Sequence, residues 1–295
     1  MFYIQYEEKP ITNLKEDEEF DISSNITSIT KAMSCQNSND YNICDKINTL
    51  ALSLYKGDVN IDNQPHGYGI KLTRNGEKYI GYWIKGEFTG WNQKIDKKGD
   101  VYFGKFKNGI LQGKGGKYTM SSNSVYKGSF INNLKEGEGE EKTNEGIYRG
   151  SFKNNTKTGK GKMIYNSGDT YEGDYFNDVF NGTGCYKWKA SGYEYIGEYK
   201  NGIMNGNGIY KWNESEYYKG EFVNGIKEGN GELRWSNGRK FIGPFKDGKP
   251  HGIGFFDNGL NFRGEMEFIK GKLNKNFLKS KTETKKSMNN NLHVN

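Results

Sequence analysis

Aromatic residues recur on one side of a two-residue alternation, and the alternation returns along most of the chain. Each unit opens on an aromatic residue, has glycine two positions later and a third residue, usually aromatic, two positions after that, as in Tyr171, Gly173 and Tyr175. A period of two predicts a strand with these residues on one face. The opening residues follow one another at steps of 21 to 24 residues: Tyr55, Tyr79, Tyr102, Tyr126, Tyr148, Tyr171, Tyr195, Tyr218, Phe241 and Phe262.

The second half of each unit predicts a return strand. A turn pair such as Asn201-Gly202 follows the first strand, and the next run opens with Gly-x-Gly. Asn-Gly between two alternating runs is typical of a β-hairpin. One hairpin is not stable alone in water, so each needs its neighbours. We therefore expect about ten hairpins side by side, with rings lying flat over the glycines of the strands.

The two ends of the chain lie outside this period. Residues 1–54 have two stretches of helical spacing, which predict a short helix capping the open end of the array; the alternative is a largely disordered extension. Residues 271–295 predict a flexible basic tail, and the tenth unit is expected to lack a return strand. The stretches with helical spacing contain Ile26, Ile29, Met33, Ile43, Ile47, Leu50 and Leu54.

Composition changes this picture little. Hydrophobic residues make up 33% of the chain, but aromatic residues make up 15% and there are 41 glycines, so the apolar surface is mainly rings. The net charge of +7 is mixed and is typical of a solvated surface. We expect no signal peptide and no membrane span. The three cysteines, Cys35, Cys44 and Cys185, are too few for a disulfide framework, which favours a cytoplasmic protein.

Tyr-x-Gly-x-aromatic, the Asn-Gly turn and Gly-x-Gly, repeated every 23 residues or so, resemble the MORN repeat (membrane occupation and recognition nexus). The resemblance covers residues 55–270 and implies an all-β fold, an elongated single-layer twisted array of hairpins. The sequence departs from the MORN pattern at Val59, at Gly90-Trp91-Asn92 and at Pro244. Members of the family occur in ciliary radial-spoke heads, cytoskeletal scaffolds and membrane contacts, which implies a surface for proteins or lipids and no reaction.

The return strands differ along the array. In the C-terminal half the two residues after Gly-x-Gly on the ring face are apolar, as in Tyr186 and Trp188, whereas earlier units have polar pairs, assigned as Lys94 and Asp96, Lys117 and Thr119, and Glu141 and Thr143. We predict an aromatic groove that binds a partner helix or extended peptide. The alternatives are that the rings pack on one another, that the N-terminal helix covers them, or that the chain forms a homodimer. The predicted partner-binding residues are Tyr175, Trp188, Tyr199, Tyr210, Trp212, Phe222 and Trp235.

Residues with catalytic or ligand-binding chemistry are sparse. His66 and His251 lie in Pro-His-Gly turns and His293 in the tail, without a neighbour that would tune a general base. Cys35 and Cys44 have no nearby histidine and do not suggest a zinc site. We therefore predict no enzyme, no metal site and no cofactor. Mixed charge and structural rings also argue against nucleic acid as a partner.

The chain is thus predicted to be a non-catalytic scaffold or adaptor in a ciliary or other cytoskeletal assembly. The alternative is a peripheral membrane protein that binds anionic phospholipids such as phosphoinositides, or a regulatory subunit in a lipid-kinase pathway. Scattered lysines of the array, Lys127, Lys219 and Lys227, and those of the tail would then contact headgroups. The lysines of the tail are Lys272, Lys275, Lys279, Lys281, Lys285 and Lys286.

Overall fold

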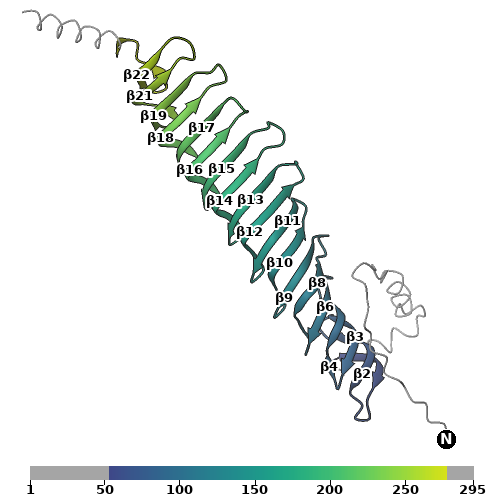
Figure 1. The fold of residues 1–295 in the computed structure, drawn as a ribbon. Coiled ribbons are helices and arrows are strands. Elements are labelled where there is room, and N and C mark those ends of the chain that lie inside the picture. Colours follow the sequence, from purple (N-terminus) through teal and green to yellow (C-terminus); the bar gives the residue numbers. More distant parts are fainter. Residues whose placement is uncertain (1–52, 278–295) are drawn as a thin grey trace, which may run out of the picture. The chain divides into compact units, whose positions relative to one another are not determined.

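The computed structural model describes residues 53–277, which form one open antiparallel sheet of 23 strands without an α-helix between them (Figure 1). The predicted N-terminal capping helix and most of the predicted tail, residues 278–295, lie outside the described residues. The strands are β1 (Ser53–Val59), β2 (Pro65–Thr73), β3 (Lys78–Ile84), β4 (Glu87–Phe88), β5 (Gly90–Ile95), β6 (Val101–Lys107), β7 (Ile110–Leu111), β8 (Gly113–Thr119), β9 (Val125–Ile131), β10 (Leu134–Lys142), β11 (Gly146–Lys153), β12 (Thr156–Tyr165), β13 (Thr170–Phe176), β14 (Val179–Lys187), β15 (Glu194–Lys200), β16 (Ile203–Lys211), β17 (Tyr217–Val223), β18 (Ile226–Arg234), β19 (Lys240–Lys246), β20 (Lys249–Pro250), β21 (Gly252–Asp257), β22 (Arg263–Ile269) and β23 (Lys272–Leu273).

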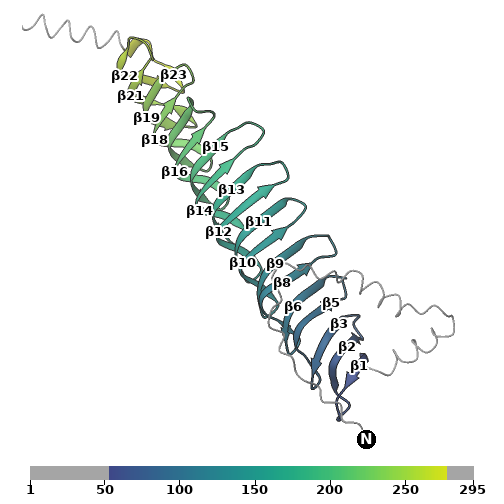
Figure 2. The same cartoon turned by 45° about the vertical axis from the view of Figure 1, so that its right-hand side comes forward.

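These strands make ten hairpins that pair in chain order, as the sequence predicts, and Figure 2 shows their loops lined up in a row beside the sheet. The return strand is interrupted in the second, third and ninth hairpins, where it is divided into β4 and β5, β7 and β8, and β20 and β21. The tenth hairpin does have a return strand, contrary to expectation. It is two residues long, and Phe268 pairs with Leu273 and Ile269 with Lys272.

Glycine pairs let the opening ring of each central hairpin lie against the backbone. In the sixth hairpin Gly173 pairs with Gly184, and the Tyr171 ring covers both. The Tyr171 hydroxyl donates to the carbonyl oxygen of Asp174 at 2.9 Å. A Cβ atom on Gly184 would lie 2.6 Å from the Tyr171 Cζ atom, so only glycine fits under the ring. The prediction that rings lie flat over these glycines is confirmed.

The third residue of each first strand ties neighbouring hairpins together. Tyr175 contacts the Tyr171 ring of its own hairpin edge-to-face at 5.2 Å and the Tyr148 ring of the preceding hairpin at 5.1 Å. Such geometry is favourable for aromatic pairs. The contact repeats without a break from the fourth hairpin to the ninth and extends to Phe268 of the tenth, which lies two residues beyond the expected third position, Met266; this aromatic zipper is the core of the array. Its rings are Phe130, Tyr126, Phe152, Tyr148, Tyr175, Tyr171, Tyr199, Tyr195, Phe222, Tyr218, Phe245, Phe241 and Phe268.

The turns inside the hairpins add a second contact between repeats. Asn201 and Gly202 have φ values of 50° and 81°, and two positive φ angles match the type I′ turn that the sequence predicts. The Gly202 amide donates to the carbonyl oxygen of Phe180 in the preceding hairpin at 2.8 Å. At the corresponding place Asp178 also accepts a hydrogen bond from the Lys157 amide at 2.8 Å, so each turn is fixed to the hairpin before it.

Two irregular return strands differ from the simple pattern. Asn92 occupies the place of a glycine, and its side chain accepts from the Tyr82 amide at 2.7 Å and donates to the Tyr82 carbonyl at 3.0 Å, replacing ladder bonds. In the third hairpin a bulge between Gly113 and Gly116 shifts the register by one residue. Tyr118 therefore pairs with Tyr102, and the prediction that placed Lys117 on the ring face is wrong.

Candidate interaction surfaces

Three of the predicted partner-binding residues lie inside the aromatic zipper. Tyr175, Tyr199 and Phe222 are only 5%, 6% and 2% exposed. Each contacts the opening rings of two successive hairpins, so its surface is already covered by the array itself. The structure therefore favours the alternative in which the rings of Tyr175, Tyr199 and Phe222 pack on the other rings of the array. These three residues do not belong to an exposed groove.

The other four predicted residues, Trp188, Tyr210, Trp212 and Trp235, are partly buried at the edge of this core. The Trp188 ring lies 5.5 Å from that of Tyr210, and Tyr210 lies 5.0 Å from Trp212. Contacts of Tyr186 with Trp188 at 4.6 Å and with Tyr165 at 6.0 Å extend the line. We name this line the tryptophan row, with Tyr165, Tyr186, Trp188, Tyr210 and Trp212 as its members.

A lysine ends the tryptophan row. The Lys227 Nζ atom lies 4.4 Å from the centre of the Trp212 ring and 5.4 Å from that of Tyr218. Burial lowers the pKa of this ammonium group. Within the described residues no ring contact joins Trp212 to Trp235, whose partner is Phe256 at 6.4 Å. The structure therefore brings Trp188, Tyr210 and Trp212 together and leaves Trp235 separate.

A cavity of about 210 Å³ lies beside the other end of the row. Tyr165 and Phe180 line it together with Lys157 and Asp178. Tyr175 also lines it, and its hydroxyl is buried without a hydrogen-bond partner in the described part of the chain. Burial raises the pKa of this phenol, so the hydroxyl stays protonated at neutral pH.

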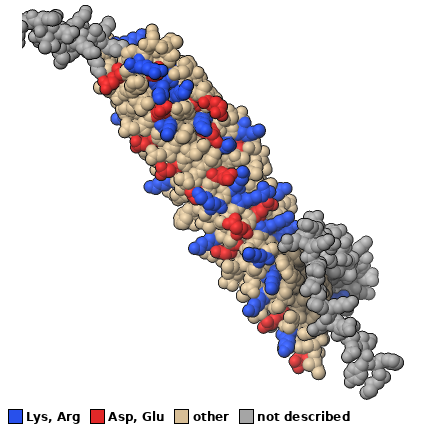
Figure 3. All heavy atoms as spheres, in the orientation of Figure 1, with Lys and Arg blue, Asp and Glu red and all other residues tan. Residues whose placement is uncertain are grey.

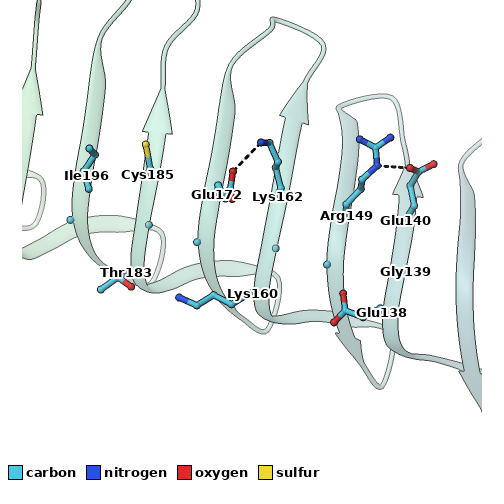
Figure 4. A pocket seen from close by; sticks show the side chains of 15 residues that line it. Glu138, Gly139, Glu140, Arg149, Lys160, Lys162, Glu172, Thr183, Cys185 and Ile196 are labelled. Carbon is cyan, nitrogen blue, oxygen red and sulfur yellow. Dashed lines mark hydrogen bonds and ion pairs between the residues drawn. The ribbon is translucent and has the colours of Figure 1, made fainter. Parts of the chain in front are cut away.

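The opposite face of the sheet carries an open trough of about 1020 Å³ over hairpins four to seven (Figure 4). Its floor is made by the paired glycines, and charged side chains line it. Arg149 donates to Glu140 at 2.6 Å and Lys162 to Glu172 at 2.9 Å, as Figure 4 shows. Because these cations face carboxylates, the trough offers no concentrated charge to a ligand.

Cys185 also lines the trough but lacks the environment of a reactive thiol. Burial, and secondly the hydrogen bond to Glu194 at 3.4 Å, raise the pKa of the thiol to about 11. The thiolate that would act as nucleophile is therefore scarce at neutral pH. Among the described residues no cluster of three or more His, Cys, Asp or Glu could hold a metal ion.

Sequence reasoning missed a group of rings on the trough-side face, at the N-terminal end of the array. Tyr68, Tyr82 and Trp91 are 43%, 58% and 52% exposed, and Phe103 lies next to Trp91. We name these four residues the outer aromatic patch. The available signal was a change at the outward positions of the strands, which are mostly Lys, Glu or Ser in other hairpins and aromatic here.

The lysines predicted to contact lipid do not converge in the described part of the chain. Lys272 and Lys275 are exposed, while Lys279, Lys281, Lys285 and Lys286 lie outside the described residues. On the face seen in Figure 3, Lys and Arg are interspersed with Asp and Glu. Over residues 53–277 no helix has the length and apolar character needed to cross a membrane.

Two solved structures show a weak likeness to the chain. The TCP10 domain of Danio rerio CPAP is 10% identical, with a TM-score of 0.35 over 65% of this chain and 88% of that one. The TCP domain of SAS-4 (dCPAP) from Drosophila melanogaster, in complex with a proline-rich motif of Ana2, is 10% identical, with a TM-score of 0.30 over 66% of this chain and 92% of that one. Such low scores carry no argument about function.

Comparison with sequences is more informative. The chain is 36% identical over 80 residues to the inactive protein tyrosine kinase pTKL of Plasmodium berghei (strain Anka), a stretch that covers 27% of this chain and only 6% of that protein. The MORN repeat profile matches eight segments, at residues 55–78, 102–124, 126–146, 148–170, 171–192, 195–215, 218–238 and 241–259. These segments make up more than half of the sequence and coincide with hairpins of the sheet, and the chain therefore belongs to the MORN-repeat family.

Proposed function

We propose that this protein is a non-catalytic scaffold that binds a protein partner along the tryptophan row. A MORN array is a repeat scaffold, and the row is the part of the predicted groove that the zipper does not enclose. Tryptophan and tyrosine are over-represented among residues that dominate binding energy. A helix or an extended peptide laid along Trp188, Tyr210 and Trp212 would bury these rings.

Affinity purification with mass spectrometry tests this proposal. We expect the Trp188→Ala and Trp212→Ala double variant to lose at least one partner that the wild-type chain retains at equal expression. Ile196→Ala is the control because it removes an exposed apolar side chain from the opposite face, away from the outer aromatic patch. Circular dichroism must show the same sheet content and thermal midpoint for all three proteins. An unchanged set of partners in the double variant would refute binding along the row.

The ciliary or cytoskeletal location is part of the proposal and is supported by family resemblance alone. We expect a fluorescently tagged chain to co-sediment with the detergent-insoluble cytoskeleton or with axonemes. Release of the chain by detergent together with membrane markers would instead favour binding to a membrane.

Binding to an anionic membrane is the second candidate function. It is supported by the exposed Lys272 and Lys275 and by the lysines that follow them in the sequence. Sedimentation with phosphoinositide-containing liposomes at low and high salt tests it, since electrostatic binding of this kind weakens as salt rises. Equal sedimentation with neutral and anionic liposomes would refute it.

A further inference from the structure

The outer aromatic patch exposes large apolar surface where the fold has no use for it. On the other face of these hairpins the rings of Tyr55, Tyr79, Trp83 and Phe88 already pack on one another, so Tyr68, Tyr82 and Trp91 are not needed to hold the hairpins together. They come from β2, β3 and β5, which are neighbours in the sheet. The Tyr68 and Tyr82 rings are in edge-to-face contact at 5.5 Å. Contiguous exposed rings of this kind usually mark an interaction site.

Lysines continue the same line across the sheet. Phe103 pairs with Lys117 in the next strand, and Lys117 pairs directly with Lys127 in the strand after that. Trp91 pairs with Lys105. Because all these residues occupy outward positions of consecutive strands, the patch and the three lysines form one continuous surface, with rings at one end and ammonium groups at the other.

The strands of the lysine end contain no carboxylate, and the first one on the same face is Glu140 of β10, which lies opposite Lys127 but is bound by Arg149 at 2.6 Å. Residues 101–134 contain five lysines and neither Asp nor Glu. Like charges directly opposite each other on antiparallel strands are destabilising, and Lys117 and Lys127 are such a pair. In the described part of the chain Lys105, Lys117 and Lys127 make no ion pair, whereas Arg149 and Lys162 on the same face do. An anionic ligand would relieve this repulsion.

We propose that this surface binds an acidic peptide segment of a partner protein, with apolar residues on the outer aromatic patch and carboxylates on Lys105, Lys117 and Lys127. The residues of this surface lie on six neighbouring strands, β2, β3, β5, β6, β8 and β9, which span about 24 Å at the usual strand spacing. An extended peptide of about seven residues covers that length. Charge complementarity selects the acidic half of the peptide, and the exposed rings select its apolar half.

Trp91 and Phe103 are neighbours of lysines, but the distance of Tyr68 and Tyr82 from all three lysines favours a peptide over single-stranded nucleic acid. A nucleic acid strand has a phosphate for every base, so a surface that binds it needs basic groups alongside all of its rings. Here Tyr68 and Tyr82 precede the three lysines instead of alternating with them. The surface also lies on the opposite face from the tryptophan row, so the proposal does not depend on the proposed function.

Selection from a phage-displayed library of random 12-residue peptides, with the full chain immobilised, tests the proposal. We expect the recovered peptides to combine Asp or Glu with Phe, Tyr, Trp or Leu. In fluorescence anisotropy, Tyr82→Ser with Trp91→Ser and Lys117→Glu with Lys127→Glu should each weaken the best peptide at least tenfold. Rising salt should weaken it too, because screening reduces attraction between exposed charges. All four side chains are exposed, so both double variants should fold, which circular dichroism checks.

Ile196→Ser and Lys219→Glu are matched controls on the same face but distant hairpins, and should leave the affinity within twofold. Peptides rich in Lys or Arg would overturn the proposal, as would acidic peptides that the two double variants bind as well as the wild type does. A labelled oligo(dT) of 20 nucleotides and phosphatidylserine vesicles are run in parallel. Tighter binding of either probe than of the selected peptide, lost in the same variants, would assign the surface to nucleic acid or lipid instead.

Discussion

Gly184→Ala tests whether the close approach of ring and backbone limits the sequence of the array. The added Cβ atom would lie 2.6 Å from both Cε2 and Cζ of Tyr171 and would also overlap the hydroxyl oxygen. Ordinary contact needs roughly 3.4–4 Å, so the ring must move by close to 1 Å. It has little room, because Phe180 stacks on it at 3.6 Å and Tyr175 and Tyr199 contact it at 5.2 and 5.4 Å.

The magnitude follows from what the displaced ring loses. Overpacking a core costs about 1–3 kcal/mol. Loss of the bond from the Tyr171 hydroxyl to Asp174 adds about 1 kcal/mol. Replacing glycine by alanine also stabilises the folded state by about 0.4–1 kcal/mol, because it lowers the conformational entropy of the unfolded chain. We therefore expect Gly184→Ala to lower the free energy of unfolding by about 2–3 kcal/mol.

A double-mutant cycle separates this overlap from a general effect of alanine. In a Tyr171→Ala background the ring is absent, so Gly184→Ala should cost nothing, and the coupling energy should be about 2 kcal/mol or more. Gly264→Ala is the matched control. Its Cβ atom would lie 3.4 Å from Phe262, which is an ordinary contact, and we expect a change within about 0.5 kcal/mol.

Guanidinium unfolding followed by far-UV circular dichroism gives the free energies of unfolding of the wild type, the two single variants and the double variant. The four proteins must show the same dependence of this free energy on guanidinium concentration, because repeat arrays can unfold in parts. If Gly184→Ala costs the same in both backgrounds, to within about 0.5 kcal/mol, the ring is not what excludes a side chain and the account of the repeat is wrong.

Three further substitutions test particular contacts by the same measurement. Tyr175→Phe removes a buried hydroxyl without a described partner and should raise the free energy of unfolding by up to about 1 kcal/mol. Tyr195→Phe removes the hydrogen bond to the Glu198 carbonyl and should lower the free energy of unfolding by about 1 kcal/mol. A large loss of stability in Tyr175→Phe would show that the Tyr175 hydroxyl does have a partner. Asn92→Ala should cost about 1–3 kcal/mol because it leaves the Tyr82 amide unpaired, whereas the Tyr82 carbonyl keeps the bond from the Thr89 amide at 3.3 Å. Gln93→Ala beside it should change little, and equal losses would contradict this role. The Ser121 amide and the Tyr118 hydroxyl donate to Asp100 and lower the pKa of its carboxyl group, so the stability that Asp100 contributes is present above the ordinary pKa and is lost as pH falls through the lowered pKa. Asp100→Asn should cost about 1–2 kcal/mol at pH 7, and its difference in stability from the wild type should vanish in acid. A difference that stays constant with pH would contradict this role of the Asp100 carboxylate.

The repeat and its hairpins could be predicted from the sequence because each unit repeats the same local pattern of aromatic, glycine and turn residues. Alternation fixes which residues share a face, and Asn-Gly fixes the turn. The place of the glycines also follows, since a ring such as Tyr171 needs a bare backbone beneath it. These inferences use positions within one hairpin, and the structure confirms them.

Contacts between hairpins could not be predicted in the same way. A single-layer sheet suggested that Tyr199 would be exposed, but its ring fits between Tyr171 and Tyr195 and is covered by both. The run Gly113-Lys114-Gly115-Gly116 allows two registers, and only pairing with β9 selects the one that directs Lys117 outward. Register and burial depend on neighbours that the pattern of one unit does not contain.

The same packing indicates where functional variation can lie. The ring face is occupied by the zipper, and a change at Tyr171 or Gly184 would affect folding before it affected binding. Outward positions carry no such demand, so Tyr82 and Trp91 could replace the commoner polar residues without disturbing the array. The ends of the return strands are equally free, and there Trp188 and Trp212 stand where earlier hairpins have Thr143 and Asp96. In a repeat whose core positions are all constrained, the residues that differ from one hairpin to the next are the ones available to recognise partners.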